Sequence, residues 1–371
     1  MNTKKKYSTF LAGIAVAALL LTGCSADTPA PGDGPVPDEL TLVIASAVNT
    51  PKEEVAAYAV AQELGYFAEE NLNVEVVNSE GSVAAVQAIA SGSADITPTD
   101  AGAILAGAEN GVDIAAIGGL VQFWPWQIAT LPGSDIQTAA DLRGANIGVI
   151  SLASGSAPYA RAFVNSAGLN AETDVNLLPV GIGAQAQAAL ESGQVDALAL
   201  YTQVYAVLEN EGVKLAYLDN TAAFDGLRSI TFGASASAVA ENGDVYERFL
   251  RASYKAMLFS VTNPEAAMQI GYRVFPQMLD GSSIEDRLDN DVNSLNAWLN
   301  TTVPSDVAPA DLPAWGDIPA SDWDATQAYM ILAGQLTANQ DLDSVWNSSL
   351  LEGANNFDAA AVIAQAEAWT P

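Results

Sequence analysis

The sequence predicts an α/β protein built from two lobes that share the same strand–helix–strand connections. Short runs rich in β-branched residues alternate with alanine-rich helical stretches, a pattern typical of α/β folds with mainly parallel strands. One helix–glycine–strand unit occurs twice along the chain. The chain has 371 residues and is 50% hydrophobic, which is enough for two domains of ordinary size.

The first copy of the unit can be followed element by element. Strands are expected at residues 40–45, 73–78 and 95–97. A helix is expected at residues 52–64, with Gly65 as its C-terminal cap, and Ser82 is placed to cap a second helix that runs to Ala90. Thr99 or Asp100 would then cap a helix that ends at Gly111.

The second copy supports the two-lobed interpretation. Residues 87–95 read QAIASGSAD and residues 188–196 read AALESGQVD, so alanine, Ser-Gly and aspartate recur in register. Each copy reads as a helix, a glycine stop and a buried strand that an aspartate precedes. The strand of the second copy is expected at residues 197–200. We therefore expect two lobes with the same wiring.

The N-terminus has the pattern of an export signal. Three lysines at positions 4–6 precede an apolar or small run at residues 10–21, which is too short to span a bilayer comfortably. The run ends in Leu-Thr-Gly before Cys24 and resembles the lipobox of bacterial lipoproteins, which implies that Cys24 is diacylated and becomes the mature N-terminus. We expect residues 1–23 to be a signal peptide and residues 24–39, rich in proline and glycine, to be a flexible tether. Cys24 is the single cysteine, so no disulfide is expected.

Composition excludes several classes of function. The formal net charge is −31, and no basic stripe is present that could neutralise phosphates, so nucleic acid is not an expected partner. The histidine count is zero, which removes Ser-His-Asp and Cys-His catalysis and any histidine-ligated metal site. No phosphate-binding loop or dinucleotide fingerprint occurs in the required context. We expect no catalytic residues, no metal and no cofactor.

Four segments, in order, resemble the substrate-binding proteins of ABC importers for sulfonates, nitrate, taurine and thiamine-pyrimidine precursors. Residues 64–75 (LGYFAEENLNVE) are similar to that family's GYF-x-x-x-x-L-x-V segment, and residues 90–96 (ASGSADI) to its A-x-G-x-x-D element. Residues 141–149 (DLRGANIGV) fit its D-L-x-G-K-x-I-G-V segment, with Ala145 in place of the lysine, and residues 355–358 (NNFD) resemble its terminal motif. The resemblance spans nearly the whole mature chain.

The resemblance implies a two-lobed, type II periplasmic-binding-protein-like fold with a hinge and a ligand cleft between the lobes. Lobe one would comprise residues 40–130 and 229–371, and lobe two residues 131–228. The chain would cross near residues 131–133 and return near residues 228–229. Pockets for small molecules favour such interfaces, and helix N-termini at strand-to-helix turns would present backbone N–H groups to the cleft.

The candidate ligand contacts lie at these turns and on an aromatic segment, residues 122–126. The turn residues also serve as helix caps, and the tryptophans are equally compatible with core packing. The indole rings could instead stack on a flat ligand or hold a cation. For an anionic ligand, only Arg228 has a hinge-like position. The expected ligand-binding residues are Asn49, Ser82, Thr99, Trp124, Trp126, Ser154, Ser156, Tyr201 and Phe232.

The expected function is that of an extracytoplasmic, lipid-anchored and monomeric solute-binding protein that delivers a small organic molecule to the permease of an ABC importer. The aromatic segment favours a planar heteroaromatic ligand such as a thiamine-precursor pyrimidine. The alternatives are a sulfonate, taurine or nitrate, a quaternary ammonium compound, or a signalling or adhesion lipoprotein whose cleft is filled. The same branch includes a pyrimidine-synthesising enzyme that depends on histidine and cysteine. This chain has no histidine, and its single cysteine is expected to carry the lipid, so the enzyme interpretation is disfavoured.

Overall fold

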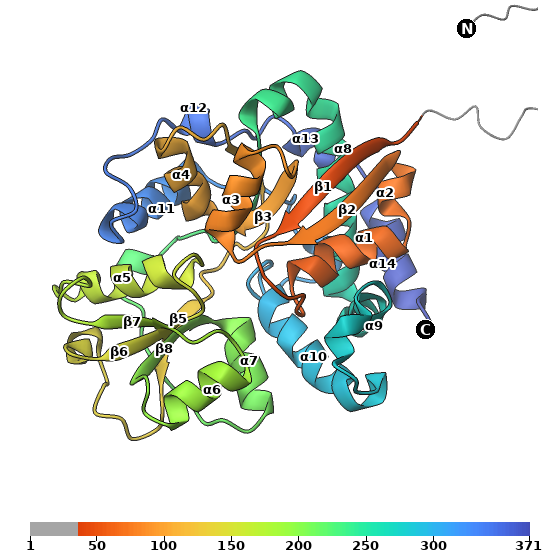
Figure 1. Cartoon of the computed structure of the whole chain (residues 1–371). Helices are drawn as coiled ribbons and strands as arrows, with labels where there is room; N and C mark the ends of the chain where they lie inside the picture. Colours follow the sequence, from red (N-terminus) through yellow and green to blue (C-terminus); the bar gives the residue numbers. More distant parts are fainter. Residues whose placement is uncertain (1–35) are drawn as a thin grey trace, which may run out of the picture. The chain divides into compact units, whose positions relative to one another are not determined.

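The computed structural model describes residues 36–371, and their ten strands form two separate five-stranded sheets (Figure 1). The predicted signal peptide and Cys24 lie outside the described residues. In spatial order the first sheet contains β2 (Leu72–Asn78), β1 (Asp38–Ile44), β3 (Ile96–Asp100), β10 (Ile230–Ala234) and β4 (Ala115–Gly119). The second contains β7 (Asn176–Pro179), β6 (Asn146–Val149), β8 (Ala197–Tyr201), β5 (Trp126–Thr130) and β9 (Ala216–Leu218).

Helices connect the strands and form a long C-terminal series. Those up to β9 are the π-helical turn η1 (Glu54–Ala59), α1 (Val60–Glu63), α2 (Tyr66–Glu69), α3 (Ser82–Ala90), α4 (Ala101–Glu109), the short η2 (Ala139–Leu142), α5 (Ser156–Ser166), α6 (Ala184–Glu191) and α7 (Thr202–Asn210). The later ones are η3 (Ala222–Phe224), α8 (Ala236–Thr262), α9 (Pro264–Val274), η4 (Pro276–Leu279), α10 (Ile284–Leu299), η5 (Pro309–Asp311), α11 (Ala320–Leu332), α12 (Leu342–Val345), α13 (Leu351–Ala354) and α14 (Ala359–Ala368).

The two sheets have the same wiring, as the duplicated unit predicts. In each sheet the first three strands along the row are parallel and the fourth is antiparallel to its neighbours. The repeated aspartates make matching bonds. Asp95 Oδ2 accepts from the backbone N–H of Thr41 at 2.7 Å, and Asp196 Oδ2 accepts from the N–H of Asn146 at 2.8 Å. Each aspartate therefore ties the start of its strand to the neighbouring parallel strand, β1 in the first sheet and β6 in the second.

The chain passes from the first sheet to the second earlier than the sequence predicts. Strand β4 ends at Gly119 in the first sheet and β5 begins at Trp126 in the second, so the first crossing is residues 120–125 and not residues 131–133. Residues 126–130, assigned above to lobe one, pair with β8 and β9. The return crossing lies between β9 and β10, in residues 219–229. The exact limits of the two lobes stay a prediction.

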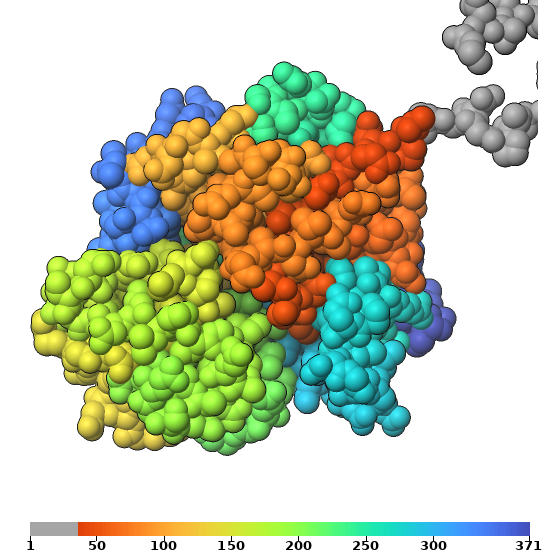
Figure 2. All heavy atoms as spheres, in the orientation of Figure 1, coloured from red at the N-terminus to blue at the C-terminus, as the bar shows by residue number. Residues whose placement is uncertain are grey.

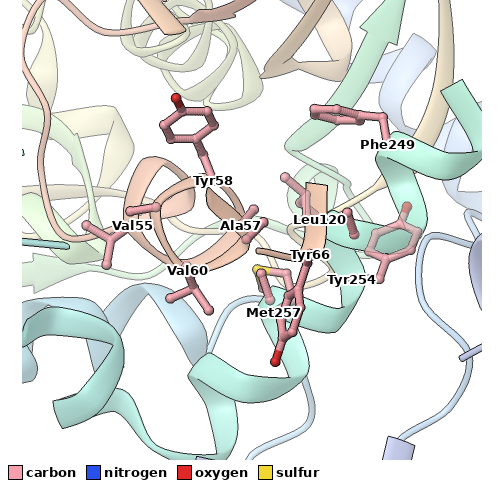
Figure 3. Packing of buried hydrophobic residues seen from close by; sticks show 14 of the residues in the cluster. Val55, Ala57, Tyr58, Val60, Tyr66, Leu120, Phe249, Tyr254 and Met257 are labelled. Carbon is pink, nitrogen blue, oxygen red and sulfur yellow. The ribbon is translucent and has the colours of Figure 1, made fainter. Parts of the chain in front are cut away.

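One hydrophobic core lies beneath the first sheet. It joins η1 and α1 to helices α8 and α9, and Figure 3 shows some of its buried side chains. The rings of Phe67 and Phe249 stack with centroids 5.5 Å apart, and the rings of Phe232 and Phe249 meet edge to face at 5.4 Å. This packing holds η1, and hence the residues just before it, in a fixed position.

A second core includes residues of both sheets, so the two halves are packed against each other. It brings Val43 and Ile104 together with Ile128, Ile147 and the helices α5 and α11. Asn165 on α5 donates through Nδ2 to the carbonyl of Leu332 on α11 at 2.8 Å. In Figure 2 the yellow and green atoms of the second sheet and its helices gather into one group that borders the orange atoms of the first.

Two predicted helix caps are wrong. Ser82 and Ser156 are the first residues of α3 and α5, and neither caps its helix: Ser82 Oγ accepts from the N–H of Asp100 at 3.4 Å, and Ser156 Oγ from that of Ile150 at 2.9 Å. Asp100 caps α4 as predicted, accepting from the N–H of Gly102 at 2.9 Å.

Within residues 36–371 no helix is both long and apolar enough to cross a bilayer.

Candidate functional site

A cavity of about 570 Å³ lies between elements of the two sheets. The carboxyl ends of the parallel strands open onto it: Ala45 follows β1, Asp100 ends β3, Ile150 follows β6 and Tyr201 ends β8. Ligands in open α/β sheets bind outside the carboxyl ends of strands, and cavities of this size are typical of small-molecule sites. Both crossings also contribute, through Pro125 and Ser229.

Aromatic and aliphatic side chains form one wall of the cavity. The rings of Trp126 and Tyr201 meet edge to face, with centroids 5.2 Å apart and planes inclined by 79°. Trp126 Nε1 donates to Ser229 Oγ at 3.4 Å, which fixes the orientation of the indole. The remaining large apolar residues that line the cavity are Val48, Val121, Ile150, Ile182, Ile230 and Trp298. Such a wall suits a flat apolar body with polar groups at its edge.

A buried cluster of charges lies at the start of η1. Lys52 Nζ contacts Glu53 Oε1 at 2.5 Å and Glu54 Oε2 at 2.7 Å, and all three side chains are at most 7% exposed. Burial by itself would lower the pKa of Lys52, but the two carboxylates outweigh that effect and raise it. Burial raises the pKa of Glu53, although Lys52 acts in the opposite direction. Lys52 and Glu53 line the cavity, and η1 is a π-helical turn, a feature frequent at functional sites.

Asp100 provides a second buried carboxyl group at the cavity. Its Oδ2 accepts from Ser229 Oγ at 3.1 Å, while Oδ1 accepts from the N–H of Gly102. Burial raises the pKa of Asp100 to about 6, and these two hydrogen bonds act in the opposite direction. Asp100 also borders a smaller cavity of about 310 Å³ between α3, α4 and the loop before α5.

Four of the expected ligand contacts line the cavity: Ser82, Trp126, Ser154 and Tyr201. Ser154 lies in the loop after β6, where its Oγ bonds to the carbonyl of Ser151 at 2.8 Å and to Ser156 Oγ at the same distance. The structure thus brings residues from two predicted turns, one residue that follows a predicted strand and one from the predicted aromatic segment to one cavity. Whether each contacts a ligand stays a prediction.

The other five expected contacts do not line the cavity. Asn49 Oδ1 accepts from Asn78 Nδ2 at 2.9 Å, and Thr99 is fully buried in β3 with its hydroxyl 3.5 Å from the carbonyl of Ser82. Ser156 is fully buried beneath the loop that carries Ser154. These side chains complete backbone and side-chain hydrogen bonds, which explains their positions.

The remaining two are aromatic residues that pack elsewhere. Trp124 points into a cluster with Tyr159, Phe224 and Tyr329, whose ring lies 5.1 Å from that of Trp124. Phe232 packs on Phe249 in the core beneath the first sheet. Core packing, which the sequence allowed for the tryptophans, describes Trp124, although its side chain is only partly buried. Phe232 is fully enclosed by the core.

Sequence reasoning missed Lys52, Glu53, Asp100, Ser229 and Trp298 as cavity residues. A signal was present for Lys52 and Glu53, since three adjacent charged residues follow the turn after the first strand.

Arg228, considered for an anionic ligand, does not line the cavity. It pairs with Asp322, Nη2 to Oδ2 at 2.6 Å, and donates through Nη1 to the carbonyl of Gln122 at 2.9 Å. Arg228 thereby fastens the two crossings to α11.

Two sheets of identical wiring, two crossings and a cavity between them define a two-lobed periplasmic-binding-protein fold. The periplasmic aliphatic sulphonate-binding protein SsuA of Escherichia coli has this fold: the structures superimpose with a TM-score of 0.63 at 17% identity, over 84% of this chain and 93% of SsuA. The predicted fold is confirmed.

The chain belongs to the NMT1/THI5-like family, whose profile matches residues 52–267. It is 27% identical over 354 residues to riboflavin-binding protein RibY of Chloroflexus aurantiacus, covering 91% of this chain and 96% of that protein. It is also 28% identical over 217 residues to the formylaminopyrimidine-binding protein of Halalkalibacterium halodurans, covering 57% and 64%. Both relatives are binding proteins, and the family resemblance drawn from the sequence is confirmed.

Proposed function

We propose that this protein is the extracytoplasmic solute-binding component of an ABC importer and that it captures a planar nitrogen heterocycle of the flavin or pyrimidine type. The observation that carries the proposal is the cavity of about 570 Å³ at the carboxyl ends of the parallel strands of both sheets. Trp126 and Tyr201 line this cavity. A cleft filled by side chains, as a signalling or adhesion lipoprotein would have, does not fit such a cavity. Two relatives named for riboflavin and formylaminopyrimidine support the ligand class.

The charges at the cavity argue against sulfonate, taurine and nitrate. Among the described residues, no arginine lines the cavity, and its one lysine, Lys52, is held by Glu53 and Glu54. An oxyanion is bound best by an arginine fork or by several free N–H donors. Arg228, the one candidate at a crossing, is engaged by Asp322 and the carbonyl of Gln122.

A thermal-shift screen tests the ligand class. The purified protein is melted with riboflavin, formylaminopyrimidine, taurine, nitrate and glycine betaine, each over a range of concentrations. We expect one or both heterocycles to raise the Tm, because a ligand at 100 times its Kd adds about 2.7 kcal/mol of stability. A rise with taurine or nitrate and none with the heterocycles would contradict the proposal.

The protein is proposed to bind its ligand without changing it, so that ATP hydrolysis belongs to a separate subunit. The chain contains no histidine, and the two buried carboxyl groups that line the cavity have one contact or more each: Glu53 with Lys52, and Asp100 with Ser229 and the N–H of Gly102. The bound heterocycle should be recovered intact after incubation and denaturation, as judged by mass spectrometry. Conversion with multiple turnovers would show an enzyme instead.

The membrane anchor is proposed to be a diacylated Cys24. The lipobox-like sequence before Cys24 supports this, and so does the binding class, because the chain must stay near its membrane permease. Cys24→Ser should move the protein from the membrane fraction to the soluble fraction or leave the precursor unprocessed. Metabolic labelling with a fatty acid that persists in the Cys24→Ser variant would refute the anchor. The mature protein is proposed to act as a monomer.

A further inference from the structure

In the charged cluster of Lys52, Glu53 and Glu54, one carboxylate oxygen has no hydrogen-bond partner among the described residues. Glu54 uses both oxygens: Oε1 accepts from the N–H and hydroxyl of Thr50 at 2.6 and 3.0 Å, and Oε2 contacts Lys52. Glu53 uses only Oε1, which also contacts Lys52. Glu53 Oε2 has no hydrogen-bond partner among the described residues, although the side chain is 2% exposed.

The unpaired oxygen belongs to the carboxylate that lines the cavity. Glu53 lines it and Glu54 does not. A buried acceptor without a partner destabilises the fold, and more so when the group is charged, so native structures rarely keep one without a use. The core of Figure 3 packs η1 at Val55 and Tyr58 and so prevents the helix start from turning outward to water.

The cluster also sets the sign of the charge that the cavity accepts. Lys52, Glu53 and Glu54 carry one positive and two negative formal charges, and the lysine is already shared between both carboxylates. A ligand group that donates an N–H to Glu53 would satisfy the free oxygen, whereas an anionic group would be repelled by it in a low-dielectric site.

Building on the proposed function, we propose that Glu53 is a specificity-determining residue whose Oε2 accepts a hydrogen bond from an N–H group at the edge of a neutral or cationic planar heterocycle. Trp126 and Tyr201 hold the flat body of the ligand, and Glu53 selects the heterocycle by its donor. Anionic ligands are rejected by the same group.

Matched ligand pairs test this on the unaltered protein. Riboflavin is compared with 3-methylriboflavin, and formylaminopyrimidine with its analogue in which the ring amino group is dimethylated. We expect the N–H member of the pair that binds to have a Kd at least tenfold lower than its methylated partner, since hydrogen bonds to charged groups contribute about 1.5–3 kcal/mol. Equal affinity within that pair would overturn the inference while leaving the proposed function in place.

Glu53→Gln separates the hydrogen bond from simple crowding by the added methyl groups. The variant should lose most of the preference for the N–H member, whereas a purely steric penalty would persist in it. Glu75→Gln is the matched control, because Glu75 is an exposed glutamate that does not line the cavity; it should keep the preference. Circular dichroism and a thermal melt establish whether each variant is folded. If Glu53→Gln does not fold, the comparison of the matched ligands on the unaltered protein tests the inference by itself.

Failure of the two proposals can be told apart. If neither heterocycle raises the Tm of the unaltered protein, the proposed ligand class is wrong and the inference about Glu53 is wrong with it. If a heterocycle binds and Glu53→Gln retains full discrimination within the pair, only the inference is wrong.

Discussion

At the scale of single residues, Asp100 gives the protein a specific pH dependence. Burial raises its pKa from 3.8 in the unfolded chain to about 6 in the fold, so the folded state holds the proton more tightly. The contribution of Asp100 to the free energy of unfolding is therefore greatest below pH 4 and is lost as the pH rises through 6, by an amount on the order of 3 kcal/mol.

Asp100→Asn should remove this dependence. The amide is neutral at every pH and its oxygen can still accept from the N–H of Gly102. We expect the variant to show a flatter profile of Tm against pH between 4 and 7 than the unaltered protein, and a higher relative stability at pH 7. A profile that is unchanged by the substitution would show that Asp100 is not the group that titrates.

The two tryptophans of the aromatic segment are expected to report differently on the ligand. Trp126 lines the cavity, whereas Trp124 is enclosed by Tyr159, Phe224 and Tyr329. Trp126→Phe should reduce the ligand-induced change in tryptophan fluorescence, leaving Trp298 as the remaining tryptophan at the cavity, and Trp124→Phe should retain the whole change. Trp126→Ala should also weaken binding about tenfold, because aromatic pairing contributes roughly 1 kcal/mol. An equal loss of the signal in both phenylalanine variants would contradict this assignment.

At the scale of elements, the duplicated aspartates are expected to stabilise their sheets in parallel ways. Asp95→Ala and Asp196→Ala should each lower the free energy of unfolding by about 1 kcal/mol, because each leaves one strand N–H without its carboxylate acceptor. Asp95 is the less exposed of the two, so its loss should be the larger. Chemical denaturation measures both, and Asp→Asn at each position, which keeps an acceptor oxygen, should recover part of the loss. No change at either position would contradict the prediction.

The order of the elements was predictable from the sequence, because periodicity and glycine stops are local signals. Gly92 and Gly193, which end the repeated helices, have positive φ of +69° and +71°, as a glycine stop requires. The position of residues 126–130 was not predictable in the same way, since a short apolar strand gives no indication of which sheet it will join. Pairing with β8 and β9, more than sixty residues later in the chain, decides that.

The site was only partly predictable for a similar reason. Sequence places Ser82, Ser154 and Tyr201 near strand ends, and those positions do meet at the cavity. It does not say which of two neighbouring side chains faces inward: Ser154 lines the cavity while Ser156 turns to the backbone of Ile150. Lys52 and Glu53 could not be predicted as cavity residues, because adjacent charged residues normally lie on a solvated surface. Their burial depends on packing by helices that are distant in the sequence.

At the scale of the whole folded body, a close contact beside the cavity joins a loop of the second sheet to helix α3, which follows a strand of the first sheet. The carbonyl of Ala153, in the loop after β6, accepts from the N–H of Val83 on α3 at 3.3 Å. Gly81 allows this approach: its φ is +136°, and a Cβ there would lie 3.0 Å from the same carbonyl oxygen. The contact holds the loop that carries Ser154 against the start of α3.

Gly81→Ala should therefore weaken ligand binding as well as stability. Gly92→Ala is the control for a positive φ, because Gly92 also has a positive φ, +69°, but a Cβ there would meet nothing within 4 Å. Both should lose roughly 1–2 kcal/mol of stability from the backbone conformation. Only Gly81→Ala should raise the Kd of the ligand, as measured by isothermal titration calorimetry. Equal Kd values for the two variants would show that the contact does not influence the cavity.

The order of strands has a consequence for how the chain acquires its structure as it is synthesised. All strands of the second sheet come from one continuous stretch, residues 126–218, so that half can form without help from the rest. In the first sheet β4 pairs only with β10, and β10 ends at Ala234. The half that is synthesised first is thus completed last. Until residue 234 has emerged, β4 has no neighbour, and its apolar edge is open to aggregation or to chaperones.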